Sequence, residues 1–408
     1  MGKPKIRFKG FDNDWEQRKL GDSLMSLQNN TLSRADLSNE SGVAKNVHYG
    51  DVLIKFGEVL DISKEQLPMI TDERVLSKYK ASFLQNGDVI VADTAEDSTV
   101  GKCSEIVGLN DEVVLSGLHT IPYRPVENFA SGYLGYYLNS DTYHNQLIPL
   151  MQGIKVTSIS KSAMQDTDIF YPKSIEEQGK ISNYLQSLDH LITLHQRKCE
   201  ETKKMKKYML QKMFPQNGSK VPEIRFKGFT DDWEQRKLSD IAVLTSSKRV
   251  HAEDYVETGV PFYRGKEISE LKEHKPISEV LYITEYKYNE ISSMYGSPKE
   301  GDLLITAVGT LGNTWVIDQT PFYFKDGNLI WFKDIKCNPK YLDYAMSTAD
   351  GQKKILASAI GSNQKALTMV KLNELEFMFP GKAEQDKIAE YFSYLDNLIT
   401  LHHRECST

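Results

Sequence analysis

The chain repeats itself, and this internal repeat limits the folds that it can adopt. Residues 4–20 (PKIRFKGFDNDWEQRKL) recur as residues 222–238 (PEIRFKGFTDDWEQRKL), with 14 of 17 positions identical. Residues 177–199 and 384–406 form a second pair, with 14 of 23 positions identical. Each half therefore consists of the first repeated segment, which we call the arm, then a long insert, and then the second repeated segment. Such a duplicated scaffold predicts two related domains.

The inserts between the repeated segments have diverged. The two repeat offsets, 218 and 207 residues, differ by 11, so the first insert is longer by that amount. Residues 21–173 and 239–380 share only a faint skeleton, in which 86–92 (NGDVIVA) corresponds to 300–306 (EGDLLIT). A duplication that keeps its scaffold and varies its inserts predicts one architecture that recognises two different things.

The second repeated segment has the pattern of a helix. Ser174 and Glu177 form a capping box at its start, and an apolar seam with three-four spacing follows and continues toward Pro215. The copy near the C-terminus, residues 381–408, is shorter. We expect the two helices to pack as an antiparallel pair, which also forms a partner interface. The expected seam residues are Ile181, Tyr184, Leu188 and Leu191 in the first copy and Ile388, Tyr391, Leu395 and Leu398 in the second.

These patterns predict a mixed α/β (α+β) protein with two globular domains and an internal pseudo-twofold repeat. Two long antiparallel helices would join the domains as a coiled-coil spacer. Short apolar runs between Gly, Asn and Asp turns, such as 303–306 and 329–332, are typical of strands. The expected segments are an arm at 1–20, a first domain at 21–173, a spacer helix at 174–214, a linker and second arm at 215–238, a second domain at 239–380 and a shortened spacer helix at 381–408.

Composition narrows the class of protein. The formal net charge of -6 argues against a chain that binds nucleic acid through overall positive charge, so DNA binding would need local basic patches or partners. The four cysteines are widely separated, which favours a reducing compartment over a disulfide framework or a zinc site. No apolar run reaches the length of a membrane span. We therefore expect a cytoplasmic protein.

Sequence motifs for catalysis are missing. There is no G-x-x-x-x-G-K-[ST] phosphate loop. Residues 338–341 (NPKY) resemble the N-P-P-Y motif of adenine methyltransferases, but Lys340 replaces the second proline, and Asn followed by Pro also begins ordinary helices. His195 and His402 occupy matching seam positions without a surrounding ligand set, so no metal is expected. These features predict a non-catalytic chain without a cofactor of its own.

Taken together, these features resemble the specificity subunits of type I restriction-modification systems. The marks of the resemblance, which covers nearly the whole chain, are the WEQRKL arms at 15–20 and 233–238, the GDLLIT…GTLGN run at 301–313, the GSNQKALT loop at 361–368 and the EQxKI helix starts at 177 and 384. The resemblance implies two target recognition domains that place loops in the DNA major groove. It also implies that the helices dock two methyltransferase (M) subunits, to which restriction and motor (R) subunits are added. Adenine-N6 methylation with S-adenosylmethionine, and cleavage with ATP and Mg, would belong to those partners.

Two different inserts then imply an asymmetric bipartite site whose half-sites lie about 34 Å apart on one face of B-DNA. Base edges are read by Arg or Lys at guanine and by Asn or Gln at adenine. Each basic residue is also consistent with a phosphate contact or a solvated charge. The candidates are Arg74, Lys78, Lys80, Lys102, His119 and Lys155 in the first insert, and Lys248, Arg249, Arg264, Lys266, Asn313, Gln364 and Lys365 in the second.

Two alternatives remain open at this point. A pseudosymmetric assembly scaffold whose inserts bind peptides would show the same repeat, and the salt dependence of nucleic-acid binding would separate it from a DNA reader. The basic run at 197–212 is either a DNA-facing helix side or a solvated coiled-coil face. The solvated face is the simpler interpretation.

Overall fold

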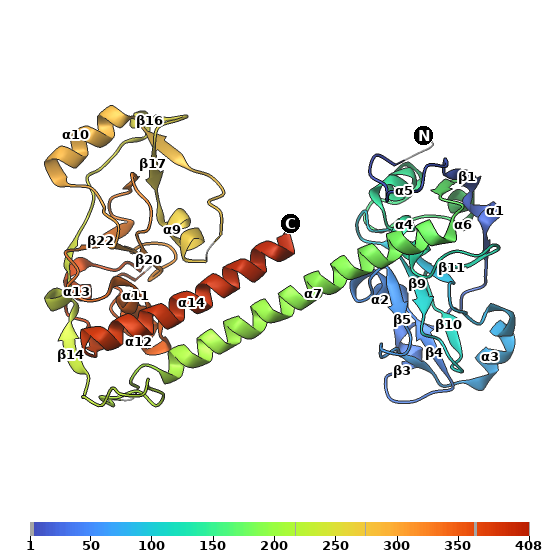
Figure 1. Ribbon diagram of the computed structural model, residues 1–408, viewed down its shortest axis with the longest axis horizontal. Coiled ribbons are helices and arrows are strands. Elements are labelled where there is room, and N and C mark those ends of the chain that lie inside the picture. Colours follow the sequence, from blue (N-terminus) through green and yellow to red (C-terminus); the bar gives the residue numbers. More distant parts are fainter. Residues whose placement is uncertain (1–3, 217, 274, 363–364, 408) are drawn as a thin grey trace. The chain divides into compact units, whose positions relative to one another are not determined.

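The computed structural model describes residues 4–216, 218–273, 275–362 and 365–407. The chain divides into two compact units, Met1–Leu191 and Ile192–Thr408, and the boundary falls inside the long helix α7 (Ile175–Lys212) (Figure 1). Each unit combines helices with β-sheets, which confirms the predicted mixed α/β class.

The first unit is built on a five-stranded sheet with the order β2-β11-β7-β9-β5. These strands are Leu24–Ser26, Thr120–Pro125, Val89–Ala92, Cys103–Val107 and Val59–Asp61. A second sheet has the order β10-β4-β6-β3, with strands Val114–Ser116, Ala44–Val47, Met69–Ile70 and Leu37–Ser38. The helices are α1 (Leu20–Ser23), α2 (Tyr49–Ile54), α3 (Glu73–Tyr79), α4 (Tyr133–Leu138), α5 (Asp141–Leu147) and α6 (Lys161–Gln165).

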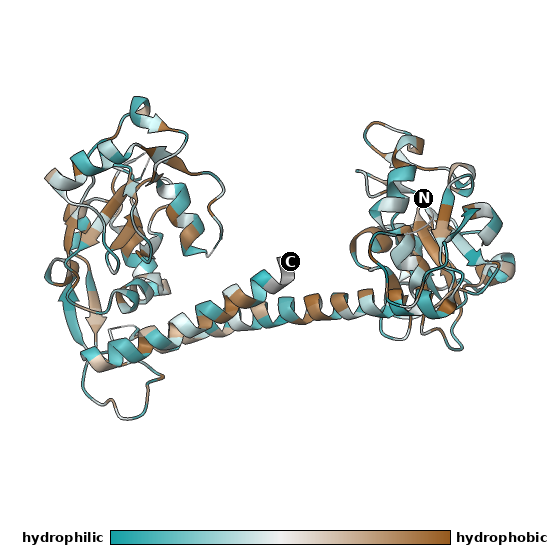
Figure 2. Cartoon of the chain, turned by 45° about the horizontal axis from the view of Figure 1, so that its top comes forward, coloured by the Kyte–Doolittle hydropathy of each residue, from teal (hydrophilic) through white to brown (hydrophobic). Residues whose placement is uncertain are grey.

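The central strand β7 explains how this sheet makes a core on both faces. Its four residues are all fully buried. Because side chains alternate along a strand, Val89 and Val91 join one apolar cluster with α4 and α5, whereas Ile90 and Ala92 join another on the opposite face. Figure 2 shows brown, apolar strands in the interior of the unit.

The second unit repeats this plan. Its main sheet has the order β15-β22-β19-β20, with strands Val243–Thr245, Leu329–Lys333, Leu303–Thr306 and Thr314–Val316. A smaller sheet, β16-β18-β17-β21, consists of Tyr255–Val256, Leu281–Ile283, Val260–Tyr263 and Tyr323–Phe324. The helices are α8 (Leu238–Ile241), α9 (Gly265–Lys272), α10 (Glu285–Tyr295), α11 (Pro339–Ser347), α12 (Ala349–Ala357), α13 (Met369–Asn373) and α14 (Lys382–Ser407).

The repeated arms make the same contacts in both units. The strand β1 (Glu16–Lys19) pairs antiparallel with β13 (Asp168–Tyr171), as β14 (Glu234–Lys237) pairs with β23 (Glu376–Phe379). Arg7 binds Glu177 through Nε and Nη2 at 2.5 and 2.8 Å, and Arg225 binds Glu384 in the same way at 2.7 and 2.8 Å. These bidentate ion pairs fasten each arm to the start of its own helix.

A glutamine completes each junction between insert and helix. The side chain of Gln178 accepts from the backbone N–H of Ala130 at 2.9 Å and donates to the carbonyl of Pro172 at 2.8 Å. Gln385 accepts from the N–H of Asn338 at 3.0 Å and donates to Pro380 at 2.8 Å. In both units the junction is held through main-chain groups of the insert.

The repeated helices are close to their expected bounds. The helix expected at 174–214 is α7, Ile175–Lys212, and the one expected at 381–408 is α14. Within the second unit, the latter part of α7 runs antiparallel to α14, because His195 contacts His402 while Lys206 binds Asp396 farther along. Figure 2 shows the alternation of apolar and polar residues along both helices.

Candidate nucleic-acid interface

Three loops of the first unit meet at one edge of its main sheet. They are the loop after β7 (93–102), the turn before β11 (116–119) and the loop at 152–158. The N–H of Asp93 donates to the carbonyl of His119 at 3.1 Å, and the N–H of Ile159 donates to Asp93 at 2.9 Å. The short strands β8 (Thr94–Ala95) and β12 (Thr157–Ser158) pair across the first and third loops. We call these three loops the first recognition edge.

The second unit builds the same edge with the same backbone bonds. The N–H of Ala307 donates to Asn328 at 2.7 Å, and the N–H of Leu367 donates to Ala307 at 2.9 Å. The second recognition edge thus consists of the loop after β19 (307–313), the turn before β22 (326–328) and the loop at 360–366. The loop at 360–366 closes through an antiparallel bridge between Ile360 and Ala366, as the loop at 152–158 closes between Gln152 and Ser158.

Lys102 and Asn313 occupy equivalent positions at these edges. The carbonyl of Lys102 accepts from Ala92, and the carbonyl of Asn313 accepts from Thr306, both at 2.9 Å. Lys102 Nζ donates to the carbonyl of Leu53 in α2 at 2.9 Å, and Asn313 Nδ2 donates to Ser269 Oγ in α9 at 2.9 Å. Both candidates therefore tie the loop to the neighbouring helix, which gives them a positioning role in the free chain.

His119 lies at the first edge in a constrained geometry. Its φ is +55°, in the left-handed region that histidine adopts more readily than most residues. Its Nδ1 lies 3.5 Å from Thr94 Oγ1 and 3.5 Å from Asp93 Oδ1. Its ring meets Tyr49 edge-on, with the centroids 5.3 Å apart, and the side chain is 47% exposed. The ring is thus held on two sides while about half of it faces solvent.

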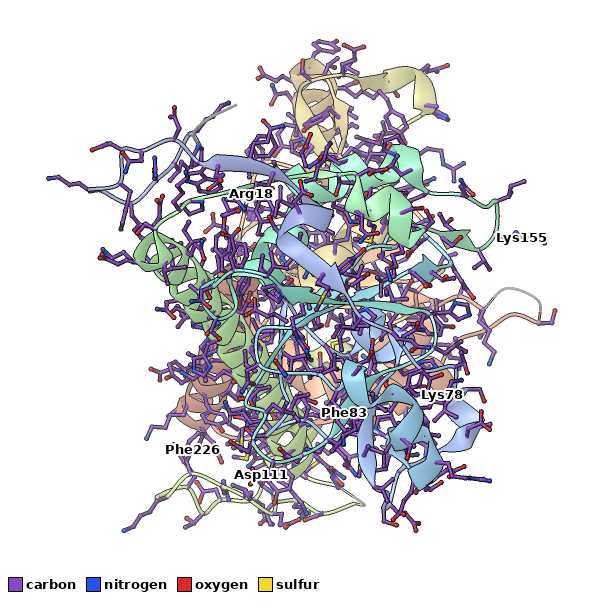
Figure 3. All side chains as sticks on the ribbon, turned by 90° about the vertical axis from the view of Figure 1, so that its right-hand side faces the viewer. Arg18, Lys78, Phe83, Asp111, Lys155 and Phe226 are labelled. Carbon is purple, nitrogen blue, oxygen red and sulfur yellow. The ribbon has the colours of Figure 1, made fainter. Side chains whose placement is uncertain are left out.

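The remaining candidates of the first insert are divided between two places. Lys155 lies in the exposed loop 152–158, whereas Lys78 lies on α3 (Figure 3). Arg74, at the start of α3, is bound to Asp72 at 2.8 Å, and Lys80 follows the helix. The tyrosine that ends α3, Tyr79, packs in an apolar cluster with the second sheet. The contacts place Lys155 at the recognition edge together with His119 and Lys102, but they do not bring Arg74, Lys78 and Lys80 there.

The second edge gathers several basic candidates. Arg249 binds Asp326 in the turn before β22 at 2.9 Å. Lys266 is exposed in the first turn of α9, next to Gly265, which lies beside Val308. Lys365 is exposed in the loop 360–366. Gln364 lies outside the described residues.

Arg264 and Lys248 make internal contacts instead. Arg264 binds Glu267 at 2.7 Å, and it is 29% exposed. Lys248 lies over the ring of Tyr295, with Nζ 5.0 Å from the centroid, and its N–H donates to Tyr323 Oη at 3.1 Å. These three contacts lie within the second unit and need no DNA.

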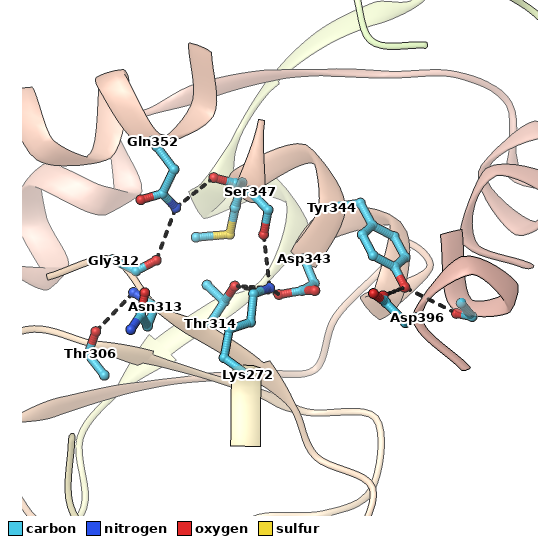
Figure 4. Close-up of polar contacts among 12 residues, drawn as sticks. Lys272, Thr306, Gly312, Asn313, Thr314, Asp343, Tyr344, Ser347, Gln352 and Asp396 are labelled. Atoms are coloured by element: carbon cyan, nitrogen blue, oxygen red, sulfur yellow. Dashed lines mark hydrogen bonds and ion pairs between the residues drawn. The ribbon is translucent and has the colours of Figure 1, made fainter. Parts of the chain in front are cut away.

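A polar network that sequence reasoning did not single out fixes α9. Lys272 Nζ donates to Thr314 Oγ1 at 3.1 Å, to Asp343 Oδ1 at 2.6 Å and to Ser347 Oγ at 2.9 Å (Figure 4). These partners belong to β20 and α11, so the network anchors the helix that borders the second edge. Its members are far apart in the sequence and share no motif, so only the tertiary structure brings them together.

Asn328, Asp93 and Thr94 are further edge residues that the sequence candidates missed. Asn328 is the counterpart of His119 in the second unit. The carbonyl of Asn328 accepts from the N–H of Ala307, as the carbonyl of His119 accepts from the N–H of Asp93. The sequence could have pointed to Asp93 and Thr94, because they directly follow residues 86–92, the counterpart of the segment that contains the predicted strand 303–306.

The chain matches the model of the type I restriction modification DNA specificity domain twice, over residues 12–204 and 230–407. The two matches cover most of the sequence. The chain belongs to the specificity subunits of type I restriction-modification systems. It is thus a non-catalytic specificity subunit, as predicted.

Curated relatives agree with this assignment. A specificity subunit of the type I restriction enzyme MjaX from Methanocaldococcus jannaschii is 24% identical over 417 residues, covering 96% of this chain and 89% of the relative. The MjaVIII specificity subunit of the same organism is 24% identical over 270 residues, covering 62% of this chain and 61% of the relative.

Solved structures share the fold of this specificity subunit. The S subunit of a type I restriction-modification system from M. genitalium superposes with a TM-score of 0.61 at 14% identity, covering 99% of this chain and 95% of the other. A structure from a study of type I complex assembly and conformational transition has a TM-score of 0.50 at 16% identity, covering 99% and 94%. At these identities the similarity concerns the fold alone.

Two further properties bear on the class of site. Within the described ranges, no three or more His, Cys, Asp or Glu side chains are grouped so that they could hold a metal ion. No helix among the described residues has the length and apolar character needed to cross a membrane.

Proposed function

We propose that each unit of this specificity subunit reads one half of a bipartite DNA site by placing its recognition edge in the major groove. The observation that carries this proposal is the pair of matching edges. In both units three loops converge on the same backbone hydrogen bonds, yet they present different side chains. Equivalent frames with different surfaces are what an asymmetric bipartite site requires.

The side chains at the two recognition edges suit different hydrogen-bonding groups of the DNA bases. The first edge offers the carboxylate of Asp93, the hydroxyl of Thr94, which donates to that carboxylate, and His119; a carboxylate can accept from the amino group of cytosine. The second edge offers the donor Lys365 and the amide of Asn328, and Lys266 adds a donor from the neighbouring start of α9; these groups suit guanine and adenine. We therefore expect the two half-sites to differ in sequence.

The chemistry would reside in other subunits. In the proposed complex, two methyltransferase subunits dock on the repeated helices and transfer a methyl group from S-adenosylmethionine to adenine N6. Restriction subunits use ATP and Mg for cleavage, and the complex acts in the cytoplasm. The chain itself would select the DNA sequence, and its family assignment supports this division of labour.

Exchange of one insert tests the proposal. The complex is reconstituted with residues 239–380 replaced by the insert of another specificity subunit, and methylated adenines are mapped genome-wide. One half-site is expected to change while the other and the gap stay fixed. A change in both half-sites, or in neither, would overturn the proposal.

A one-turn insertion after Cys199 is the matched control for this exchange. It lengthens α7 without touching either recognition edge, so the gap should widen while both half-sites stay the same.

Salt dependence separates a DNA reader from a peptide-binding scaffold. Binding of the reconstituted complex to its site should weaken steeply between 50 and 200 mM salt, by roughly 10³-fold or more, because phosphate contacts release counterions. Affinity that is insensitive to salt would favour the scaffold.

A further inference from the structure

The loop 152–158 of the first recognition edge is a short, closed hairpin. Gln152 and Ser158 exchange both backbone hydrogen bonds, at 2.9 and 2.8 Å, so the chain reverses between them. Gly153 has a φ of +121°, and a Cβ at this position would lie 2.0 Å from the carbonyl oxygen of Val156. The turn therefore requires glycine at this place.

Both ends of this hairpin are anchored in the first unit. Ile159 is only 3% exposed and belongs to the core, and Met151 packs against the same core. The strand β12 also pairs with β8, which lies in the loop after β7. The hairpin is therefore presented at the recognition edge by anchored backbone on each side.

Apolar side chains occupy the end of the hairpin, residues 153–156, which we call the tip. Ile154 is fully exposed, and Val156 is 55% exposed. Lys155 lies between them and is also exposed (Figure 3). Single aliphatic side chains are common on protein surfaces. Here two of them flank a lysine on an anchored turn, so the tip combines apolar surface with a positive charge.

The second recognition edge lacks this combination. Its loop 360–366 closes through the same kind of bridge, between Ile360 and Ala366. The sequence between these two residues is GSNQK, which contains no large apolar side chain. The shared backbone frame therefore does not require an apolar tip. The tip chemistry belongs to the first insert and to what that insert contacts.

The major groove of DNA offers one apolar group, the 5-methyl group of thymine, among hydrogen-bond donors and acceptors. A protruding aliphatic side chain such as Ile154 is suited to this small target, and a neighbouring lysine is suited to the phosphates beside the groove. A stable protein interface typically buries about 800 Å² on each partner. Two aliphatic side chains on a four-residue turn provide too little surface for that, so the tip fits DNA better than a protein.

We propose that Ile154, supported by Val156, contacts the 5-methyl group of a thymine in the half-site read by the first unit, while Lys155 contacts the phosphate backbone. This inference rests on the proposed function, to which it adds the chemical group that one loop recognises. It requires that the half-site of the first unit contain a thymine in one of its strands.

Replacement of thymine by deoxyuridine, which lacks only the 5-methyl group, tests the inference. The complex is reconstituted with its methyltransferase partners, and its site is mapped from methylated adenines. Each thymine of the first half-site, in either strand, is then replaced singly in a duplex, and affinity is measured by competition. One replacement should weaken binding roughly fourfold, because the contact buries one methyl group.

The variant Ile154→Ala should weaken binding to the unmodified duplex by a similar factor and abolish the effect of deoxyuridine at that position. Ile154→Val keeps a branched aliphatic side chain and should retain part of the effect. Neither change should destabilise the fold, because the side chain is fully exposed. Ile360→Ala, at the second edge, is the matched control and should leave the deoxyuridine effect in the first half-site unchanged.

Lys155→Ala should weaken binding to the unmodified and the deoxyuridine duplexes equally and should lower the salt dependence of binding, as expected for a phosphate contact. A changed base preference in this variant would overturn the assignment of Lys155 to the backbone.

Three results would overturn the methyl contact. They are a first half-site without thymine, indifference to every deoxyuridine replacement, and an equal loss of affinity for both duplexes in Ile154→Ala. Failure of the Ile154→Ala complex to assemble without DNA, measured by sedimentation, would also overturn it, because the tip would then bind a partner subunit.

The failure of this inference can be distinguished from the failure of the proposed function. If the complex prefers its mapped site to unrelated DNA but ignores deoxyuridine, the methyl contact is refuted and the reading function stands. If exchange of residues 239–380 changes both half-sites or neither, no half-site belongs to the first unit, and the methyl contact fails together with the proposed function.

Discussion

The two units share their scaffold contacts and differ in how much of their repeated helix is covered. The arginine–glutamate pair and the glutamine junction are the same in both. In the second unit the end of α7 covers Trp233 and Leu395, whereas Trp15 and Leu188 have no such cover among the described residues. The arm and helix therefore assemble without the covering segment. The end of α7 thus adds buried apolar surface to the second unit, beyond what the shared scaffold contacts supply.

The largest effect is expected where this cover is anchored. Phe214→Ala removes a buried ring from the cluster with Trp233 and should cost about 3–5 kcal/mol of unfolding free energy in the second unit. In the first unit, Tyr184→Ala changes an aromatic side chain of the repeated helix that is 56% exposed, so it should cost less than about 0.5 kcal/mol. Denaturant unfolding of both variants checks this. Equal losses would show that the two helix faces are equally buried.

The pH dependence of stability should also separate the units. Burial raises the pKa of Glu105 from 4.5 to about 7, although N–H groups of Gly132 and Gly135 bind its carboxylate. A raised carboxyl pKa stabilises the fold below about pH 4.5, and this contribution is lost as the pH rises through about 7. The loss is on the order of 3 kcal/mol.

Glu105→Gln should remove this loss, so the stability of the variant should change less between pH 5 and pH 8. Hydrogen exchange of β9 reports the first unit directly. The second unit has Val316 at the equivalent register, opposite Leu303 as Glu105 is opposite Val89, and serves as the internal control. An unchanged pH profile in the variant would contradict the assignment.

Single residues at the recognition edges should act on one half-site each. His119→Ala should relax preference at one base pair of one half-site by about 1–3 kcal/mol, and Asn328→Ala should do so in the other. His119→Asn keeps a residue that tolerates positive φ, so it separates loss of the ring from loss of backbone geometry. Binding competition with singly altered duplexes measures the effect. An equal loss for every sequence would indicate a phosphate contact instead.

The smallest effect concerns Lys206, which forms an ion pair with Asp396 of α14. Lys206→Ala leaves the largely buried Asp396 without its ion-pair partner Lys206 and should cost about 1–2 kcal/mol. Lys203→Ala removes an exposed pair with Glu200 on the same helix and should cost less than about 0.5 kcal/mol. Thermal unfolding measures both variants, and equal shifts would show that the partly buried pair contributes no more to stability than the exposed pair.

Much of the fold could be predicted because the sequence contains the arm and the helix segment twice. The arms, the strand 303–306 and the repeated helices follow from local patterns and identity between halves. The edge residues could not be predicted with the same success, because their roles depend on distant backbone. Lys102 looked like a base reader from its place after a strand, but its ammonium reaches Leu53. The φ of His119 and the partners of Lys272 likewise arise only when separate segments meet.

The glutamine junctions have a consequence for how such chains diversify. Gln178 and Gln385 grip the inserts by the N–H of Ala130 or Asn338 and by the carbonyl of a proline, groups that exist whatever side chains surround them. These two junctions therefore make no demand on the insert side chains. The demand lies elsewhere, because Tyr136 and Tyr344 join insert to helix by donating to Asp189 and Asp396. An exchanged insert must supply the right backbone path at its ends and this tyrosine.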